Sequence, residues 1–186
     1  ALRLVEEETR PLRQAGTPHE VNFVTHSMGG LVVRHLLTHD PPERVRRFVM
    51  LVPPNNGSLK ARRFARSPGY RHFYRLVYGR RAGAQLASEP PGVFEACGIP
   101  RGVEMGVIAG TGGSRFSIPT HALAGEHDGV LTVEETALPG VPLKKVPYGH
   151  TTILFRPQAW REVAHFLDHG RFRAEEGPGE AARADP

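Results

Sequence analysis

The chain has 186 residues, of which 39% are hydrophobic and 23% are charged, a balance that suits one globular domain and excludes a collagen-like or wholly disordered chain. No apolar run approaches the roughly 18 residues of a membrane span. The single cysteine, Cys97, excludes an internal disulfide and a cysteine metal cluster, and it slightly favours the cytoplasm.

The net charge of +5 is unevenly distributed along the sequence. Between Arg44 and Ser88 there are eleven Lys or Arg residues and no Asp or Glu. Such a stretch is either a solvated helical surface or a region for peripheral contact with anionic lipid headgroups. No fold signature of a nucleic-acid-binding protein accompanies it, so we expect no nucleic-acid partner.

The first half of the chain alternates between helical and strand patterns. Residues 1–14 have the pattern of a helix, and Gly16-Thr17-Pro18 ends it. A strand over 21–25 is followed by a helix over 28–39, which Asp40-Pro41-Pro42 stops. The next strand, over 47–52, is continuously apolar, which is typical of a parallel strand covered on both faces. The core contacts predicted for the first helix are Leu2, Leu4, Val5 and Leu12.

The second half continues the alternation after a basic, mostly helical region over 60–87. Strands are predicted over 103–110 and 143–146, and an amphipathic helix over 157–169. Its predicted buried side chains are Trp160, Val163, Phe166 and Leu167. From residue 174 the composition is that of a disordered tail. The alternation predicts an α/β fold with a mostly parallel sheet flanked by helices.

The turn between the first strand and its helix carries a serine within His26-Ser27-Met28-Gly29-Gly30. A helix N-terminus directs free N–H groups and a positive dipole end toward such a hydroxyl. We therefore predict Ser27 as a nucleophile and the N–H of Met28 as an oxyanion donor. Gly29 is expected to let the helix approach the strand closely, and Gly30 to assist. The alternative is a tight turn without chemistry.

A serine nucleophile needs a base, and His150 is the best placed of ten histidines. It follows the strand over 143–146 and a short turn, at the carboxyl end of a parallel strand, where open α/β sheets place their sites. His121 and His127 are weaker candidates, and His26 is predicted to be a packing residue.

The base needs a carboxylate to orient it, and Asp128 lies on a predicted loop 22 positions before His150. Glu126 is the nearest rival, and Asp-Gly is also a common bare turn. Glu134 and Glu135 are expected in an early helical turn.

Four segments together resemble the α/β-hydrolase superfamily, in its bacterial esterase/lipase-like branch, from about Glu20 to Phe172. They are VTHSMGGLVVR, VPPNNGS, GEHDGVLTVEET and YGHTTILFRP. The order Ser, Asp, His is the one expected for this family. The resemblance implies a hydrolase domain over 1–172 with a helical cap-like insert at about 58–102, and a tail over 173–186. It also implies a Ser27 acyl-enzyme that cleaves small-molecule or lipid esters, with no metal and no cofactor.

Two features depart from the family pattern. Thr25 stands where the family motif begins with Gly, as in some lipase-like relatives. Family members also carry a His-Gly loop, which supplies a second oxyanion N–H, well before the serine, and the 26 residues before Ser27 contain no such segment. We therefore expect a fragment of a longer enzyme or a truncated relative. Alternatives to ester hydrolysis are acyl transfer or thioester hydrolysis with the same triad, and a non-catalytic binding domain.

Overall fold

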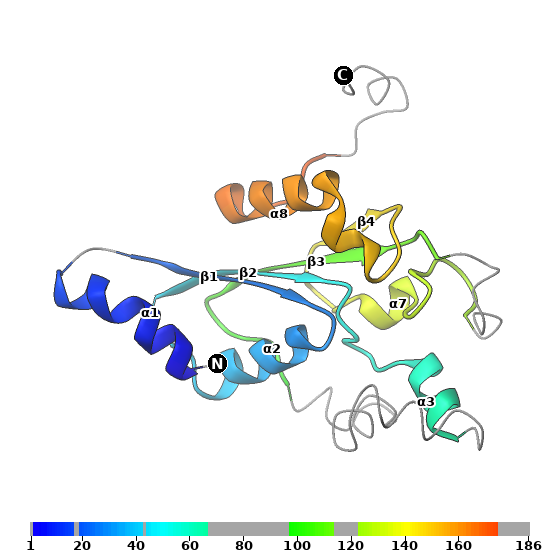
Figure 1. Cartoon of the computed structure of the whole chain (residues 1–186), viewed down its shortest axis with the longest axis horizontal. Coiled ribbons are helices and arrows are strands. Elements are labelled where there is room, and N and C mark those ends of the chain that lie inside the picture. Colours follow the sequence, from blue (N-terminus) through cyan, green and yellow to red (C-terminus); the bar gives the residue numbers. More distant parts are fainter. Residues whose placement is uncertain (1, 17–18, 43, 67–96, 114–122, 175–186) are drawn as a thin grey trace.

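The computed structural model describes residues 2–16, 19–42, 44–66, 97–113 and 123–174 (Figure 1). Within them, four strands form one parallel sheet in the order β1-β2-β3-β4. The strands are β1 (Val21–His26), β2 (Val45–Leu51), β3 (Glu104–Gly110) and β4 (Leu143–Val146). The predicted mostly parallel α/β architecture is thereby confirmed, with small shifts in strand ends.

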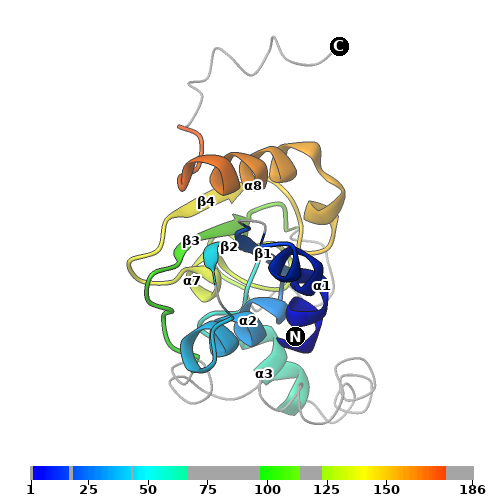
Figure 2. The ribbon, with the colours of Figure 1, turned by 90° about the vertical axis from the view of Figure 1, so that its left-hand side faces the viewer.

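Helices cover both faces of this sheet. The helical elements in the described residues are α1 (Leu2–Gln14), α2 (Gly29–His39), α3 (Leu59–Arg66), α7 (Val133–Thr136), the 3-10 turn η2 (Thr152–Phe155) and α8 (Pro157–His169). Figures 1 and 2 show α2 on one face of the sheet and α8 on the other. None of these described helices is long and apolar enough to span a membrane.

The central strand β2 divides its side chains between two apolar cores. Phe48 and Met50 pack toward α2, whereas Val49 and Leu51 pack toward α8. All four side chains are almost completely buried. Because successive side chains of a strand point to opposite faces, a continuous apolar run is what a strand covered on both sides requires.

Two predicted core contacts are wrong. Leu12 of α1 is 39% exposed, and Trp160 of α8 is 43% exposed. The buried face of α8 carries Ala159, Val163 and Phe166, and the indole N–H of Trp160 instead donates to the carbonyl of Leu154, at 2.8 Å. A residue one position from a buried one is turned by about 100° around a helix, so it lies at the border of the apolar stripe.

The predicted domain limits lie partly outside the described residues. The helix α3 begins the predicted insert at 58–102, but 67–96 are not described. The predicted tail at 173–186 is described only to residue 174, and His121 also lies outside the described part of the chain. The cap-like insert and the tail therefore stay predictions.

Candidate active site

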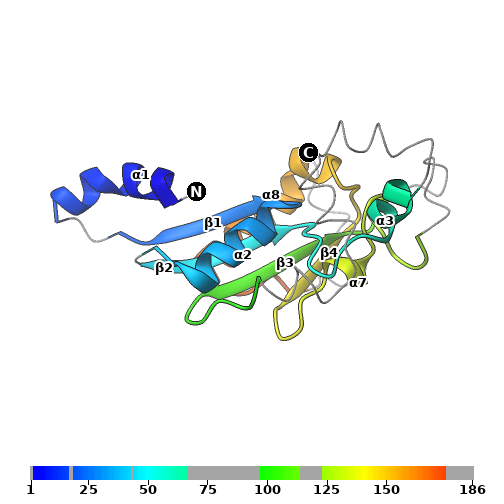
Figure 3. The ribbon, with the colours of Figure 1, turned by 90° about the horizontal axis from the view of Figure 1, so that it is seen from below.

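Loops at the carboxyl edge of the sheet bring together three residues that are far apart in sequence. Ser27 directly follows β1, Asp128 lies on the connection after β3, and His150 follows β4. Figure 3 shows the strands running in one direction, with α3 and α7 beyond their carboxyl ends and α1 at the opposite end. This is the edge where parallel sheets collect binding and catalytic groups.

Ser27 occupies a strained turn between β1 and α2. Its φ is +53°, a left-handed conformation that a non-glycine residue adopts only at an energetic cost. Its N–H donates to the carbonyl of Leu51 in β2 at 2.9 Å, which continues the sheet ladder up to the serine. Met28 has already turned into a helical conformation, with φ −56° and ψ −25°. The chain therefore changes from strand to helix at the serine itself.

The close approach of α2 to the sheet depends on Gly30 more than on Gly29. A Cβ at Gly30 would lie 3.0 Å from the Cβ of Pro53 and 3.3 Å from the sulfur of Met50. At Gly29 the nearest atom would be the Cβ of Thr25, at 3.4 Å, which is close to ordinary contact. The sequence pattern favours Gly29 as the more important of the two, and the structure reverses that order. Gly30 lies where the helix crosses β2 and the loop that follows it.

The first turn of α2 offers open backbone donors. Among the described residues, the N–H groups of Met28 and Gly29 donate to no protein acceptor, whereas the N–H of Gly30 already bonds to the carbonyl of Ser27 at 3.0 Å. Free N–H groups at the start of a helix carry the positive end of the helix dipole. They are chemically suited to hold a negatively charged oxygen beside Ser27.

His150 connects the serine to the carboxylate through its two ring nitrogens. Nδ1 lies 2.7 Å from Oδ2 of Asp128, and Nε2 lies 3.0 Å from Oγ of Ser27. An ionised carboxylate can only accept, so in the neutral ring the hydrogen is on Nδ1. Nε2 then has its lone pair directed at the serine hydroxyl, which is the arrangement a general base needs.

Asp128 is buried, and its side chain has no exposed surface. A buried carboxylate is tolerated when its oxygens are hydrogen-bonded. Here Oδ1 accepts from the N–H groups of Val130 and Leu131, at 2.8 and 2.7 Å, which leaves Oδ2 for His150. The backbone of the loop therefore fixes the carboxylate in the orientation that the imidazole requires.

The other sequence candidates lie apart from this arrangement. The Nδ1 atom of His127 accepts from the N–H of Gly129 at 3.1 Å, so this buried histidine holds its own loop. Glu126 is exposed and pairs with Lys145, and Glu134 is exposed on α7. Glu135 is half-buried and completes a capping box with Thr132 at the start of α7.

The contact of His26 with the histidine loop is one that sequence reasoning missed. Its Nε2 lies 2.8 Å from the backbone carbonyl of His150, and the centroids of the two rings are 5.1 Å apart. Burial lowers the pKa of His26. The two residues are 124 positions apart, so no local pattern could have revealed the contact.

The loop after β2 is fastened to the helix that follows the acid loop. Asn55 is buried, accepts from Nη1 of the buried Arg34 at 2.8 Å, and donates through Nδ2 to the carbonyl of Thr136 at 2.8 Å. The ammonium of Lys60 in α3 donates to the carbonyl of Gly129 at 2.6 Å. These bonds join α2, α3 and the Asp128 loop around the site.

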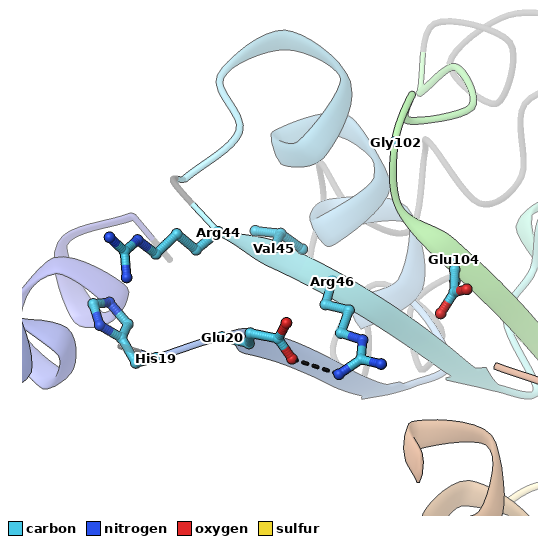
Figure 4. Close-up of a pocket in the computed structure, with 7 residues that line it drawn as sticks. All are labelled: His19, Glu20, Arg44, Val45, Arg46, Gly102 and Glu104. Carbon is cyan, nitrogen blue, oxygen red and sulfur yellow. Dashed lines mark hydrogen bonds and ion pairs between the residues drawn. The ribbon is translucent and has the colours of Figure 1, made fainter. Parts of the chain in front are cut away.

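A separate hollow lies at the amino ends of the strands (Figure 4). Its lining is His19, Glu20, Arg44, Val45, Arg46, Gly102 and Glu104. Arg46 and Glu20 pair at 2.7 Å across it, and the triad residues do not line it. Among the described residues, no group of three or more His, Cys, Asp or Glu side chains is placed to hold a metal ion.

Comparison with known proteins gives no sequence match and clear structural ones. No protein-family model and no curated protein matches the chain. The mature form of the Bacillus licheniformis lipase BlEst2 is similar with a TM-score of 0.63 at 19% identity, over 91% of this chain and 72% of the lipase chain. The phospholipase PlaB from Legionella pneumophila, in complex with thio-NAD, has a TM-score of 0.64 at 17% identity, over 91% of this chain and 46% of the other.

The propeptide form of BlEst2 is matched with a TM-score of 0.64 at 19% identity, over 94% of this chain and 40% of that one. The chain thus spans less than half the length of two of these three structures. Together these likenesses confirm the predicted α/β-hydrolase fold.

Proposed function

We propose that this chain, which has the α/β-hydrolase fold, is a serine hydrolase that cleaves carboxylic esters through an acyl-enzyme on Ser27. The observation that carries the proposal is the continuous line of hydrogen bonds from Ser27 Oγ through the His150 ring to the buried Asp128 carboxylate. The fold neighbours support it, because they are described as lipases and a phospholipase.

In the proposed acylation step, Ser27 Oγ attacks the ester carbonyl carbon while Nε2 of His150 takes the hydroxyl proton. The carboxylate of Asp128 stabilises the resulting imidazolium and keeps its orientation. The N–H of Met28 donates to the oxygen that becomes negative in the tetrahedral intermediate. When the intermediate collapses, the C–O bond to the alcohol breaks, and the departing alcohol takes the proton from Nε2.

The proposed deacylation step repeats this chemistry with water. His150 removes a proton from a water molecule, whose oxygen attacks the acyl carbon, and the bond to Ser27 Oγ then breaks. The serine regains its proton from Nε2 and the carboxylic acid leaves. Every proton removed is therefore returned, and the step needs no metal or redox partner.

Apolar side chains of α3 beside the nucleophile favour a substrate with a hydrocarbon part. The buried Ala61 of this helix packs with Phe64, Ala65 and the side chain of Met28, which directly follows the nucleophile. This apolar cluster suits the hydrocarbon part of an ester. We therefore propose small-molecule or lipid esters as the substrate class.

The proposal is tested by hydrolysis of p-nitrophenyl acetate, butyrate and octanoate. We expect turnover by the wild-type chain and a loss of at least about a thousandfold in Ser27→Ala and His150→Ala. His165→Ala is the matched control, because that half-buried histidine of α8 contacts Arg171 and His169, and neither of these is a residue of the site. Folding of each variant is checked by circular dichroism. A folded wild-type chain without turnover would favour a non-catalytic binding domain instead.

A further inference from the structure

We propose that His26, the residue before the nucleophile, is a positioning residue that holds the backbone of His150 so that its ring reaches Ser27 and Asp128 together. This inference rests on the proposed function and adds a residue to it. The observation behind it is the 2.8 Å contact between Nε2 of His26 and the carbonyl oxygen of His150.

Both backbone polar groups of His150 are hydrogen-bonded, one to the loop that carries Asp128 and the other to His26 of β1. Its N–H donates to the carbonyl of Asp128 at 2.9 Å, and its C=O accepts from His26. The acid loop therefore fixes one side of the residue, and the strand that carries the nucleophile fixes the other. A side chain whose backbone is held on both sides has few ways to move its ring.

The direction of the bond from His26 follows from chemistry. A carbonyl oxygen can only accept, so Nε2 of His26 must carry the hydrogen. Burial lowers the pKa of His26, which keeps the ring neutral near neutral pH. A neutral ring with its hydrogen on Nε2 is one defined tautomer, and that tautomer can be measured.

The position of His26 next to Ser27 in the sequence couples the nucleophile to the backbone of His150. His26 ends β1 and is covalently joined to Ser27, so a shift of the nucleophile's turn moves the donor that holds His150 in the same direction. The distance of 3.0 Å between Ser27 Oγ and His150 Nε2 is thereby protected. A displacement of about 1 Å at a reacting pair can cost on the order of a hundredfold in rate.

The test compares His26→Gln with His26→Phe. The Gln side chain can place an N–H near the position of the imidazole Nε2, whereas Phe fills the space without a donor. For p-nitrophenyl acetate we expect Phe to lower kcat by roughly 10- to 100-fold with KM nearly unchanged, and Gln to recover kcat to within about threefold of wild type. Thermal unfolding of both variants shows whether the fold is retained.

Equal kcat in wild type and a folded Phe variant would overturn the positioning role while leaving the proposed function intact. Equal losses in Gln and Phe would also overturn it, because the hydrogen bond would then not matter. A wild-type chain without esterase activity would reject the proposed function, and the inference with it.

A second measurement does not depend on activity. Long-range ¹H–¹⁵N spectra of the wild-type chain, labelled at histidine, report which ring nitrogen of His26 carries the hydrogen. We expect the Nε2–H tautomer of a neutral ring at pH 7. A neutral His26 with its hydrogen on Nδ1 could not donate to the carbonyl of His150, and it would contradict the inference directly.

Discussion

Ser27 and Asp128 show how single residues are held in orientations that they would not adopt freely. The serine has a φ of +53°, and the ladder bond from its N–H to Leu51 helps to hold it there. The Asp128 carboxylate is fully buried and accepts hydrogen bonds from the N–H groups of Val130 and Leu131. Backbone strain and buried charge both cost stability, and both are concentrated where the three site residues meet.

The role of the Asp128 carboxylate predicts the effect of Asp128→Asn. The amide oxygen can keep the bonds to Val130 and Leu131, so the NH₂ group would then face Nδ1 of His150. Two donors cannot bond, and the ring would take the tautomer with its hydrogen on Nε2, which cannot accept the proton of Ser27. We expect kcat for p-nitrophenyl acetate to fall by about 10⁴-fold, which is the size of effect that the same substitution has in a serine protease.

Asp128→Ala provides the matched control, because it removes the carboxylate without adding a donor. A variant Asp128→Asn that keeps more than a tenth of the wild-type kcat would show that the aspartate does not set the tautomer of His150.

At the scale of elements, the packing of α2 on β2 depends on one missing side chain. A methyl group at Gly30 would press against the rigid ring carbon of Pro53 at 3.0 Å, whereas one at Gly29 would meet Thr25 at 3.4 Å. We expect Gly30→Ala to lower the free energy of unfolding by roughly 1–2 kcal/mol through overpacking. Gly29→Ala should be neutral or slightly stabilising, because Ala favours helices over Gly by up to about 1 kcal/mol.

Urea unfolding of the two single variants, measured side by side, distinguishes them. If both alanines destabilised the chain equally, the contact at Pro53 would not be what requires a glycine.

Glu135, at the start of α7, makes the stability of the folded chain depend on pH. The Glu135 carboxylate accepts from the N–H of Thr132 at 2.9 Å and from the N–H of Leu59, and burial raises its pKa above the ordinary value of 4.5. A raised carboxyl pKa means that the folded chain binds this proton more tightly than the unfolded chain does. Its contribution to stability is therefore fully present below pH 4.5 and is lost as the pH rises through the raised pKa.

Glu135→Gln has no such proton to lose, so the difference in melting temperature between wild type and variant isolates this group. We expect the melting temperature of the wild type to fall relative to that of the variant as the pH rises from about 4 toward neutrality. A difference that stays constant with pH, or that grows in favour of the wild type, would contradict the raised pKa.

Local sequence patterns predicted the strands and helices, and they singled out the three residues that the structure brings together, but they did not predict the contacts that hold these residues in place. The apolar run of β2 and the strand-to-helix turn at Ser27 are local signals, so they could be predicted. The contacts from His26 to His150 and from Arg34 to Asn55 join segments 124 and 21 residues apart through side-chain directions that no local pattern specifies. The exposure of Trp160 was missed because a residue at the border of a helical stripe can turn either way.

At the scale of the whole molecule, the parallel sheet separates two kinds of surface. The carboxyl edge gathers the histidine, aspartate and serine, together with open N–H groups at the start of α2. The amino edge holds the charged hollow of Figure 4, where Arg46 and Glu20 pair with each other. Among the described residues, those that carry the proposed chemistry therefore lie at one end of the sheet.

Covalent labelling by a fluorophosphonate, followed by peptide mass mapping, tests the central claim most directly. We predict one adduct on the wild-type chain, located on Ser27, and no adduct in Ser27→Ala or His150→Ala, because the probe reacts with a serine activated by a base. A folded wild-type chain that stays unlabelled, or an adduct on a different residue, would contradict the assignment of Ser27 as an activated nucleophile.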